Sequence, residues 1–169
     1  MSAADQRFAG RVAVVTGASR GIGLAIARRI VSEGGRVCIT GRKPEPLLEA
    51  VSLLGGDEVA IAVPGSADDT QHQIDTVRAM HERFGPVDVL VNNTGINPLL
   101  GPLLDADADA FRKIVDVNVL AGLAWVRAAL TAGLAEGGAV VNVASVAGLL
   151  PAVGIGAYGA SKAALLHTT

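Results

Sequence analysis

Short runs of apolar residues alternate along the chain with longer stretches in which apolar and polar residues are mixed. The apolar runs are rich in valine, isoleucine and alanine and are almost uninterrupted. Runs of this kind are typical of strands that are covered on both faces, as in a parallel sheet. We predict strands at residues 11–16, 36–40, 59–63, 87–91 and 139–143.

The mixed stretches between these runs are long enough for helices and end at glycine. Glycine ends a helix readily because it adopts the left-handed backbone conformation at little cost. Asp68 and Asp69 are candidates for capping the third helix, since an aspartate accepts hydrogen bonds from the free N–H groups of a helix start. The predicted helices span 24–33, 45–54, 70–84 and about 107–136, and a further helix carries Tyr158.

Strands that alternate with helices predict the α/β class and a doubly wound parallel sheet with right-handed crossovers. The chain has 169 residues without an internal repeat or a linker, so we predict a single domain over 1–169. Ligands of such sheets bind outside the carboxyl ends of the strands. The residues that directly follow each predicted strand are therefore the first candidates for a functional site.

Three glycines follow the first predicted strand, in the segment Gly17-Ala18-Ser19-Arg20-Gly21-Ile22-Gly23. Gly17 permits a tight turn, and Gly21 and Gly23 let the backbone approach a pyrophosphate. The N-terminus of the following helix then faces the charge of that pyrophosphate. This order of strand, glycine turn and helix predicts dinucleotide binding. The alternative is a glycine-rich turn that serves only the packing of the helix on the strand.

Basic residues follow the second predicted strand, which in this architecture ends beside the adenine ribose. A carboxylate there binds the 2′-hydroxyl and selects NAD, whereas arginine accommodates the 2′-phosphate of NADP. Arg42 and Lys43 stand at this place, with Arg20 in the glycine loop, and no Asp or Glu does. We predict NADP(H) as the preferred cofactor, with NAD(H) as the alternative. Arg42 and Lys43 also fit the description of solvated residues that lead into the next helix.

Tyr158 and Lys162 lie four positions apart on the last predicted helix, and Ser145 follows the fifth strand. Residues four apart share one helix face, so the ammonium can lie beside the phenol and stabilise the phenolate. A tyrosine in that setting can serve as a general acid or base near neutral pH. Taken alone, the pair also fits a buried tyrosine beside a solvated lysine.

Amide side chains mark two further places. The segment Asn92-Asn93-Thr94-Gly95 follows the fourth predicted strand, where small polar residues suit a ligand crevice but also an ordinary turn. Asn118 lies among valines in the long helix, and a buried amide without partners costs about 1–3 kcal/mol. The pattern around Asn118 fits an amide that satisfies a backbone kink as well as it fits a catalytic role.

Net charge and the apolar stretches narrow the partners that we expect. The formal net charge is −2, which gives no electrostatic reason to expect nucleic acid or an anionic membrane as a partner. Glycine, asparagine or charge interrupts the longest apolar stretches, so we expect no membrane span. The N-terminus does not resemble a signal peptide, and we expect a cytoplasmic protein.

Cysteine and histidine usage argues against a metal site. Cys38 is the single cysteine, which fits a reducing compartment and leaves no cysteine-based metal site. His72, His81 and His167 are far apart in the sequence, and the first two fall on a polar helix that we expect to be exposed. We therefore expect no metal.

Taken together and in this order, the motifs resemble those of the classical short-chain dehydrogenase/reductases. The resemblance covers residues 11–169 and rests on residues 16–23, residues 92–95, Asn118, Ser145 and the segment Tyr158-Gly-Ala-Ser-Lys162. It implies a Rossmann fold and an oxidoreductase that transfers a hydride between a nicotinamide and a small carbonyl or alcohol substrate. Members are usually oligomeric, which implies a homodimer or homotetramer.

The resemblance also implies a role for each of these residues. Tyr158 would be the general acid or base, and Ser145 would bind the substrate oxygen. Lys162 would support Tyr158 and hold the nicotinamide ribose, and Asn118 would hold a water that links Lys162 to solvent. Cofactor binding, besides Tyr158 and Lys162, would fall to Gly17, Ser19, Arg20, Gly21, Ile22, Gly23, Arg42, Asn92 and Gly95.

Three features depart from the family pattern. Thr94 stands where alanine is usual, and Gly65 stands where members commonly carry an aspartate that touches the adenine amine. The third departure is length, because the last two strands of the family fold and the loop that closes over substrate are missing. We expect residues 1–169 to be part of a longer chain, or a truncated chain that a partner completes.

Because no lid would exclude water and the substrate pocket would lack one wall, we expect residues 1–169 alone to turn over poorly. The missing portion also leaves alternatives for function. One is a dinucleotide-binding protein without turnover, acting as a sensor or a structural subunit. Another is the same fold with dehydratase or epimerase chemistry. The substrate is not identified by the residues present, since Leu149, Leu150, Val153 and Ile155 indicate only that its near side is apolar.

Overall fold

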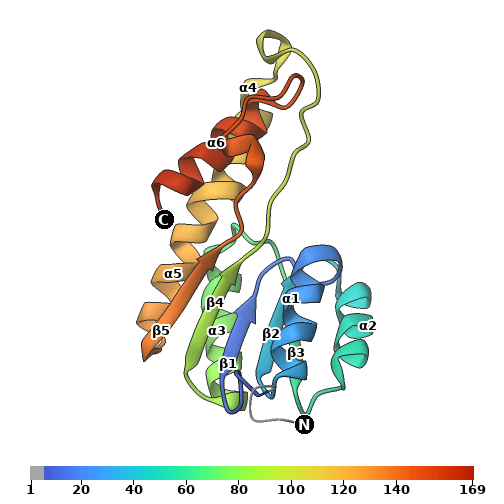
Figure 1. Ribbon diagram of the computed structural model, residues 1–169, viewed down its shortest axis with the longest axis vertical. Helices are drawn as coiled ribbons and strands as arrows, with labels where there is room; N and C mark the ends of the chain where they lie inside the picture. The colour runs from blue at the N-terminus through green and yellow to red at the C-terminus, as the bar shows by residue number, and fades with distance from the viewer. Residues whose placement is uncertain (1–5) are drawn as a thin grey trace.

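The computed structural model describes residues 6–169 and has one five-stranded parallel sheet with helices on both faces (Figure 1). The spatial order of the strands is β3-β2-β1-β4-β5. The predicted α/β class and doubly wound parallel sheet are confirmed. The strands are β1 (Val12–Val15), β2 (Arg36–Gly41), β3 (Ala60–Pro64), β4 (Val87–Asn92) and β5 (Leu134–Asn142). The helices are α1 (Gly21–Ser32), α2 (Pro44–Leu54), α3 (Thr70–Phe84), α4 (Ala108–Val115), α5 (Ala121–Thr131) and α6 (Gly156–His167), and shorter turns are η2 (Leu103–Asp105), η3 (Asp116–Leu120) and η4 (Val146–Gly148).

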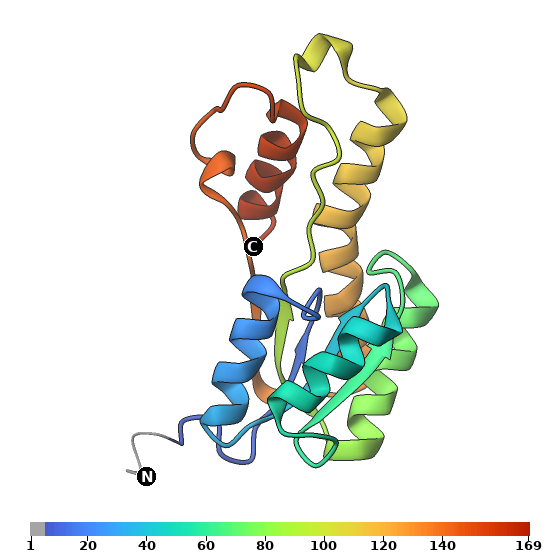
Figure 2. The ribbon, with the colours of Figure 1, turned by 90° about the vertical axis from the view of Figure 1, so that its right-hand side faces the viewer.

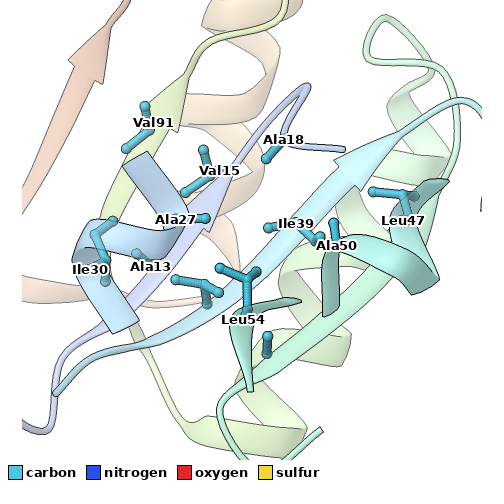
Figure 3. Close-up of a cluster of buried hydrophobic side chains, with 12 residues drawn as sticks. Ala13, Val15, Ala18, Ala27, Ile30, Ile39, Leu47, Ala50, Leu54 and Val91 are labelled. Atoms are coloured by element: carbon cyan, nitrogen blue, oxygen red, sulfur yellow. The ribbon is translucent and has the colours of Figure 1, made fainter. Parts of the chain in front are cut away.

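Alternate residues of each strand face opposite layers of helix. One row crosses the whole sheet, from Ile61 through Cys38, Val14 and Leu90 to Val140. This row packs toward α3 and α5, whereas the neighbouring residues Ala13, Val15, Val37 and Ile39 pack against α1 and α2 (Figure 3). Burial on both faces explains why the strands read as continuous apolar runs rather than alternating ones.

Helix α3 shows how local sequence sets an element boundary. It spans Thr70–Phe84, as predicted, and the Asp69 carboxylate caps it by accepting hydrogen bonds from the N–H groups of Gln71 (2.8 Å) and His72 (3.3 Å). Gly85 ends it with a φ of +104°. Of the two predicted capping candidates, Asp69 is therefore the one that caps, and Asp68 remains available for another contact.

The long helix was predicted to run to residue 136, and this is wrong by five residues. The helical stretch consists of α4, the π-helical turn η3 and α5, and it ends at Thr131. Gly133 and Gly137 have φ values of +90° and +75°, which let the chain leave the helix early and join the sheet. The first part of β5 then pairs with β4 out of register with the rest, because the pairing shifts between Val87 and Val89.

By length and composition alone, the stretch Ala108–Thr131 is long and apolar enough to cross a membrane. We had expected glycine, asparagine or charged residues to interrupt every apolar stretch too often for a membrane span, and this expectation is wrong for residues 108–131. Trp125 and Ala129 are fully buried against the sheet, and Asn118 is buried with polar partners. These contacts assign the helix to the core of the α/β fold.

Helices α4 and α6 extend beyond the carboxyl ends of the strands and lie side by side in both views (Figures 1 and 2). Both elements therefore flank the sheet edge at which ligands of doubly wound folds bind. The predicted site residues that follow β1, β2, β4 and β5 converge on this same edge.

Candidate cofactor and catalytic site

A crevice of about 420 Å³ runs along the carboxyl ends of the strands. It is lined by the loops that follow β1, β2, β3 and β4 and by the facing side of α4 and η3. The lining residues are Gly17, Ser19, Arg20, Gly21, Ile22, Thr40, Gly41, Arg42, Gly65, Ser66, Ala67, Asp68, Asn93, Thr94, Gly95, Ile96, Lys113 and Val117. Seven of the nine predicted cofactor residues of the strand-end loops, all except Gly23 and Asn92, are among them.

The loop after β1 is shaped for close approach by a ligand. Gly17 has a φ of +63°, and a Cβ there would lie 2.9 Å from Thr94 Oγ1. A Cβ at Gly23 would lie 2.6 Å from both the Gly17 carbonyl oxygen and Asn93 Nδ2. Asn93 Nδ2 in turn donates to the carbonyl of Thr16 (2.9 Å) and to that of Gly17 (3.1 Å). Gly23 thus acts through packing, because it lets helix α1 start directly against this loop.

The N-terminus of α1 is left available for an anion. The helix begins at Gly21, and no side chain caps it, since Arg20 makes no capping hydrogen bond. The first N–H groups of a helix lack partners within the helix, and the helix dipole favours negative charge near them. The glycine loop and the open helix start together fit the pyrophosphate of a dinucleotide.

Arg20 and Arg42 both line the crevice and are exposed, whereas Lys43 is exposed but does not line it. Among residues 6–169, neither guanidinium forms an ion pair. Of the three cations predicted to face a 2′-phosphate, two line the crevice. The two residues directly after β2 are Arg42 and Lys43, and neither is a carboxylate that could bind a ribose hydroxyl.

The structure turns Asn92 away from the crevice. Its Nδ2 donates to the carbonyl of Gly122 (3.2 Å) and to Asn142 Oδ1 (2.9 Å), so the side chain links β4 to α5 and β5. Contrary to expectation, Asn92 does not line the crevice, because alternate residues at the end of a strand point to opposite faces. Asn93, Thr94 and Gly95 form this part of the crevice wall instead.

Lys162 lies next to both Tyr158 and the crevice wall. Its Nζ is 5.9 Å from the centroid of the Tyr158 ring and donates to the Val143 carbonyl at 2.8 Å. A Cβ at Gly95 would lie 3.3 Å from the same nitrogen, which places the ammonium beside the loop after β4. The side chain is 3% exposed, and burial lowers the pKa of Lys162. The alternative of a solvated lysine beside Tyr158 is therefore wrong.

Ser145 begins a tight turn that packs on the helix of Tyr158. Its Oγ accepts a hydrogen bond from the Ala147 N–H (3.2 Å) and so caps η4. A Cβ at Gly148 would lie 2.7 Å from the Lys162 carbonyl carbon, and one at Gly159 would lie 2.8 Å from the Ala147 carbonyl oxygen. These two glycines let η4 and α6 touch by backbone, which holds the turn of Ser145 against the helix that carries Tyr158 and Lys162.

Asn118 connects three parts of the site through its side chain. Its Oδ1 accepts from the Ile96 N–H (2.8 Å), and its Nδ2 donates to the Ile96 carbonyl (3.0 Å) and to Ser161 Oγ (2.9 Å). Ser161 Oγ donates to the Tyr158 carbonyl at 2.7 Å. Asn118 lies in the π-helical turn η3. Its side chain forms these hydrogen bonds with the loop after β4 and with α6, and not with its own helix.

Replacing Ser161 with alanine is expected to lower the free energy of unfolding by about 1–3 kcal/mol, because the buried Nδ2 of Asn118 loses a partner. Ser32→Ala is a matched control, since Ser32 Oγ also donates to the carbonyl three residues earlier but is exposed. That control should cost no more than about 0.5 kcal/mol. Urea unfolding of both variants measures the difference, and equal losses would show that the bond to Asn118 carries no weight.

His72 is buried, which corrects the expectation of an exposed helix face. It is 8% exposed and packs edge-on against Trp125, with ring centroids 5.6 Å apart. A Cβ at Gly65 would lie 2.3 Å from the His72 ring. The ring thus fills the space that a side chain at position 65 would need, so the crevice has bare backbone there. Within residues 6–169, no three His, Cys, Asp or Glu side chains group as metal ligands.

Mild acid is expected to destabilise the fold through His72. Burial lowers the pKa of His72 from its ordinary 6.5, although Asp69 and Asp75 act in the opposite direction. Below pH 6.5 the unfolded chain therefore binds a proton before the folded one does, and the free energy of unfolding falls as the pH falls. Above that pH the ring is neutral in both states and carries no such cost.

Urea midpoints at about pH 7.5 and about pH 5 test this dependence. His72→Phe should shrink the drop between the two conditions, whereas phenylalanine at the exposed His81 should leave it unchanged. An undiminished drop in the His72 variant would assign the acid sensitivity to other groups.

Comparison with known proteins agrees with this geometry. The sequence profile of the short chain dehydrogenase family matches residues 11–169. Dehydrogenase/reductase SDR family member 4 of Oryctolagus cuniculus is 37% identical over 168 residues, covering 96% of this chain and 63% of its own. The protein of the same name from Caenorhabditis elegans is 38% identical over 168 residues, with 97% and 64% covered. The chain spans about three-fifths of the length of such curated relatives.

Solved structures give the same result for the fold. A short-chain dehydrogenase/reductase of Brucella melitensis, described as a glucose/ribitol dehydrogenase, superposes with a TM-score of 0.90 at 30% identity, covering 96% of this chain and 68% of its own. A short chain dehydrogenase of Mycobacterium smegmatis gives a TM-score of 0.90 at 30% identity, with 97% and 70% covered. The chain belongs to the short-chain dehydrogenase/reductase family of oxidoreductases.

Proposed function

We propose that the protein is an NADP(H)-dependent oxidoreductase that interconverts a small carbonyl compound and the corresponding alcohol. The observation that carries the proposal is the place of Lys162, whose buried ammonium lies between the Tyr158 ring and the Gly95 wall of the crevice. A dinucleotide in the crevice and a substrate at Tyr158 would then meet beside one cation.

In the proposed reaction a bound nicotinamide supplies or accepts the hydride. Tyr158 donates its hydroxyl proton to the carbonyl oxygen during reduction and takes a proton from the alcohol during oxidation. The Lys162 ammonium stabilises the negative charge that forms on the Tyr158 oxygen. Ser145 holds the substrate oxygen by a hydrogen bond. The side-chain bonds of Asn118 fix the loop after β4 against α6, which supports the alignment of cofactor and acid.

The preference for NADP(H) over NAD(H) is supported by Arg20 and Arg42, two exposed cations on the crevice beside the end of β2. Guanidinium groups suit phosphate because they donate several hydrogen bonds in a planar arrangement. The absence of a carboxylate after β2 removes the group that would select NAD.

Apolar residues surround the proposed substrate side of the site. Leu149, Leu150 and Val153 are largely exposed on the turn between Ser145 and Tyr158. We infer a carbonyl substrate with an apolar near side. The proposal further includes a homodimer or homotetramer and a cytoplasmic location. The location is supported by Cys38, a lone buried thiol that forms no disulfide. Burial raises the pKa of Cys38 to about 12.

Two measurements test the proposal. Calorimetric titration with NADPH and NADH should show tighter binding of NADPH. Absorbance at the reduced-nicotinamide band should then fall when a panel of apolar ketones is added to the full-length protein. Tight cofactor binding without turnover on any ketone or alcohol would favour the alternative of a dinucleotide-binding sensor or structural subunit.

A further inference from the structure

An ion pair links two elements that line the crevice. The Lys113 ammonium of α4 contacts the Asp68 carboxylate of the loop that follows β3. Both residues line the crevice. They are separated by 45 positions in the sequence, so the contact ties together two elements that the backbone does not connect directly.

Besides the ion pair of Asp68, hydrogen bonds to other elements hold the loop of residues 65–69. The Ala67 carbonyl accepts hydrogen bonds from Trp125 Nε1 (3.0 Å) and Gln73 Nε2 (2.8 Å), and the Gly65 N–H donates to the Gly41 carbonyl (2.9 Å). These contacts join the loop to α5, α3 and β2. Asp68 provides the contact toward α4, and its carboxylate also accepts from Ser66 Oγ at 2.5 Å.

Asp68 and Lys113 carry opposite charges at neutral pH, which stabilises the contact between them. Hydrogen bonds from Lys113 and then from Ser66 lower the pKa of Asp68, so its carboxylate is ionised at neutral pH. The Asp68 side chain is 20% exposed and that of Lys113 is 54% exposed. The carboxylate is thus largely fixed by its surroundings, whereas the lysine reaches it across the crevice from an exposed helix face.

The sheet order identifies the part of a dinucleotide that this pair would meet. Strand β3 is one edge of the described sheet and β5, which leads to Ser145 and Tyr158, is the other. A dinucleotide whose nicotinamide lies at Tyr158 would therefore extend its adenosine half over β2 and β3. Gly65 offers no side chain to that half, because the His72 ring occupies the space behind it.

We propose that Asp68 and Lys113 form an adenosine clasp, a pair of positioning residues that hold the loop of residues 65–69 against α4 so that the crevice is ready for the adenosine half. This rests on the proposed dinucleotide binding. Without the clasp the hydrogen bonds of Ala67 and Gly65 would still hold the loop, but its contact with α4 would have to form upon binding, and the cost of that ordering would be subtracted from the affinity. The clasp thereby acts on cofactor affinity and leaves the reacting atoms untouched.

Charge alone offers a competing explanation that mutation can separate from the clasp. If the two residues acted only through their charges on the cofactor phosphates, Lys113→Met would weaken binding and Asp68→Ala would strengthen it. The clasp predicts that both variants weaken binding, because either one breaks the same contact. The sign of the Asp68→Ala effect therefore decides between the two explanations.

The test is calorimetric titration of NADPH and of 2′-phospho-ADP-ribose, which carries the adenosine half without the nicotinamide. Asp68→Ala and Lys113→Met should each raise Kd about three- to fivefold for both ligands, the range that an exposed ion pair allows. Arg112→Met and Asp109→Ala are matched controls, since this pair removes the same charges on the same helix but does not line the crevice. Both controls should leave Kd within about twofold.

A second readout is independent of affinity. Trp125 is the only tryptophan and donates to the loop carbonyl of Ala67, so its fluorescence without ligand should change in both clasp variants and in neither control. Tighter binding by Asp68→Ala, or wild-type affinity in both clasp variants, would overturn the clasp alone. Failure of the wild-type protein to bind any dinucleotide would overturn the proposed function and the clasp with it.

Discussion

Replacing Tyr158 with phenylalanine is expected to lower kcat for ketone reduction by about 10²- to 10⁴-fold, the contribution typical of a general acid. The substitution removes one oxygen and leaves a ring of the same shape, so the contact with Lys162 across the ring face remains. The loss should therefore appear in kcat, while the Kd of NADPH stays within about threefold of wild type because Tyr158 does not line the crevice. Single-turnover absorbance of NADPH and calorimetry measure the two quantities separately.

Ser145→Ala is the natural companion to this variant. Ser145 is proposed to bind the substrate oxygen without transferring its own proton, so its loss removes one hydrogen bond and leaves the acid in place. We expect a smaller fall in kcat than in the Tyr158 variant, in the range of about 10- to 10³-fold. Activity that survives in Tyr158→Phe but not in Ser145→Ala would move the proton-transfer role away from Tyr158.

The Tyr158 variant also separates the alternatives for function. A sensor or structural subunit would bind NADPH equally well with tyrosine or phenylalanine and would show no turnover in either form. Dehydratase or epimerase chemistry would give turnover that depends on Tyr158 but consumes no net NADPH. Only an oxidoreductase combines Tyr158-dependent turnover with stoichiometric oxidation of NADPH.

The sequence was sufficient to predict the sheet because its strands are buried on both faces. The central strands β1 and β2, which carry Val14 and Cys38, are apolar on both faces, so they read as nearly uninterrupted runs that are detected without knowledge of their register. The glycine loop could also be predicted from the sequence, since a strand, a turn with three glycines and a helix follow one another without a gap. These signals are local, and the chain itself fixes their order.

Contacts between distant segments could not be predicted in this way. The polar surface of α3 led to the expectation that His72 is exposed, yet His72, Gln73 and Thr76 are all buried. The Gln73 amide donates to the loop carbonyl of Ala67, a partner that exists only after α3 packs, whereas the Thr76 hydroxyl donates to the His72 carbonyl within the helix. Periodicity records which residues are polar and says nothing of whether folding supplies them with partners.

The site shows the same division between local and distant information. Tyr158 and Lys162 could be paired because helical spacing places them on one face. Asn92 and Asn93 could not be assigned separate roles, because which of two neighbouring amides points into the crevice depends on the strand register. Asp68 and Lys113 are 45 positions apart in the sequence, and no local pattern indicates that they are in contact.

Cofactor choice is expected to depend on Arg42. Arg42→Asp should raise the Kd of NADPH about 30- to 100-fold, since it replaces a charge-assisted hydrogen bond of about 1.5–3 kcal/mol with repulsion of the 2′-phosphate. The Kd of NADH should stay within about threefold of wild type or fall, because the new carboxylate can accept hydrogen bonds from the ribose hydroxyls. Parallel calorimetric titrations with NADPH and NADH provide the comparison.

Lys43→Asp supplies a matched control for this prediction. It makes the same change of charge at the next residue, but Lys43 does not line the crevice. If direct contact with the 2′-phosphate decides the preference, the control should change the Kd of NADPH by less than about fivefold, as expected for a solvent-screened charge. Equal effects at both positions would mean that the basic patch attracts the cofactor only as a diffuse charge. In that case NADP(H) would be favoured by long-range attraction, and the preference would disappear as the salt concentration rises, whereas a direct contact from Arg42 would persist.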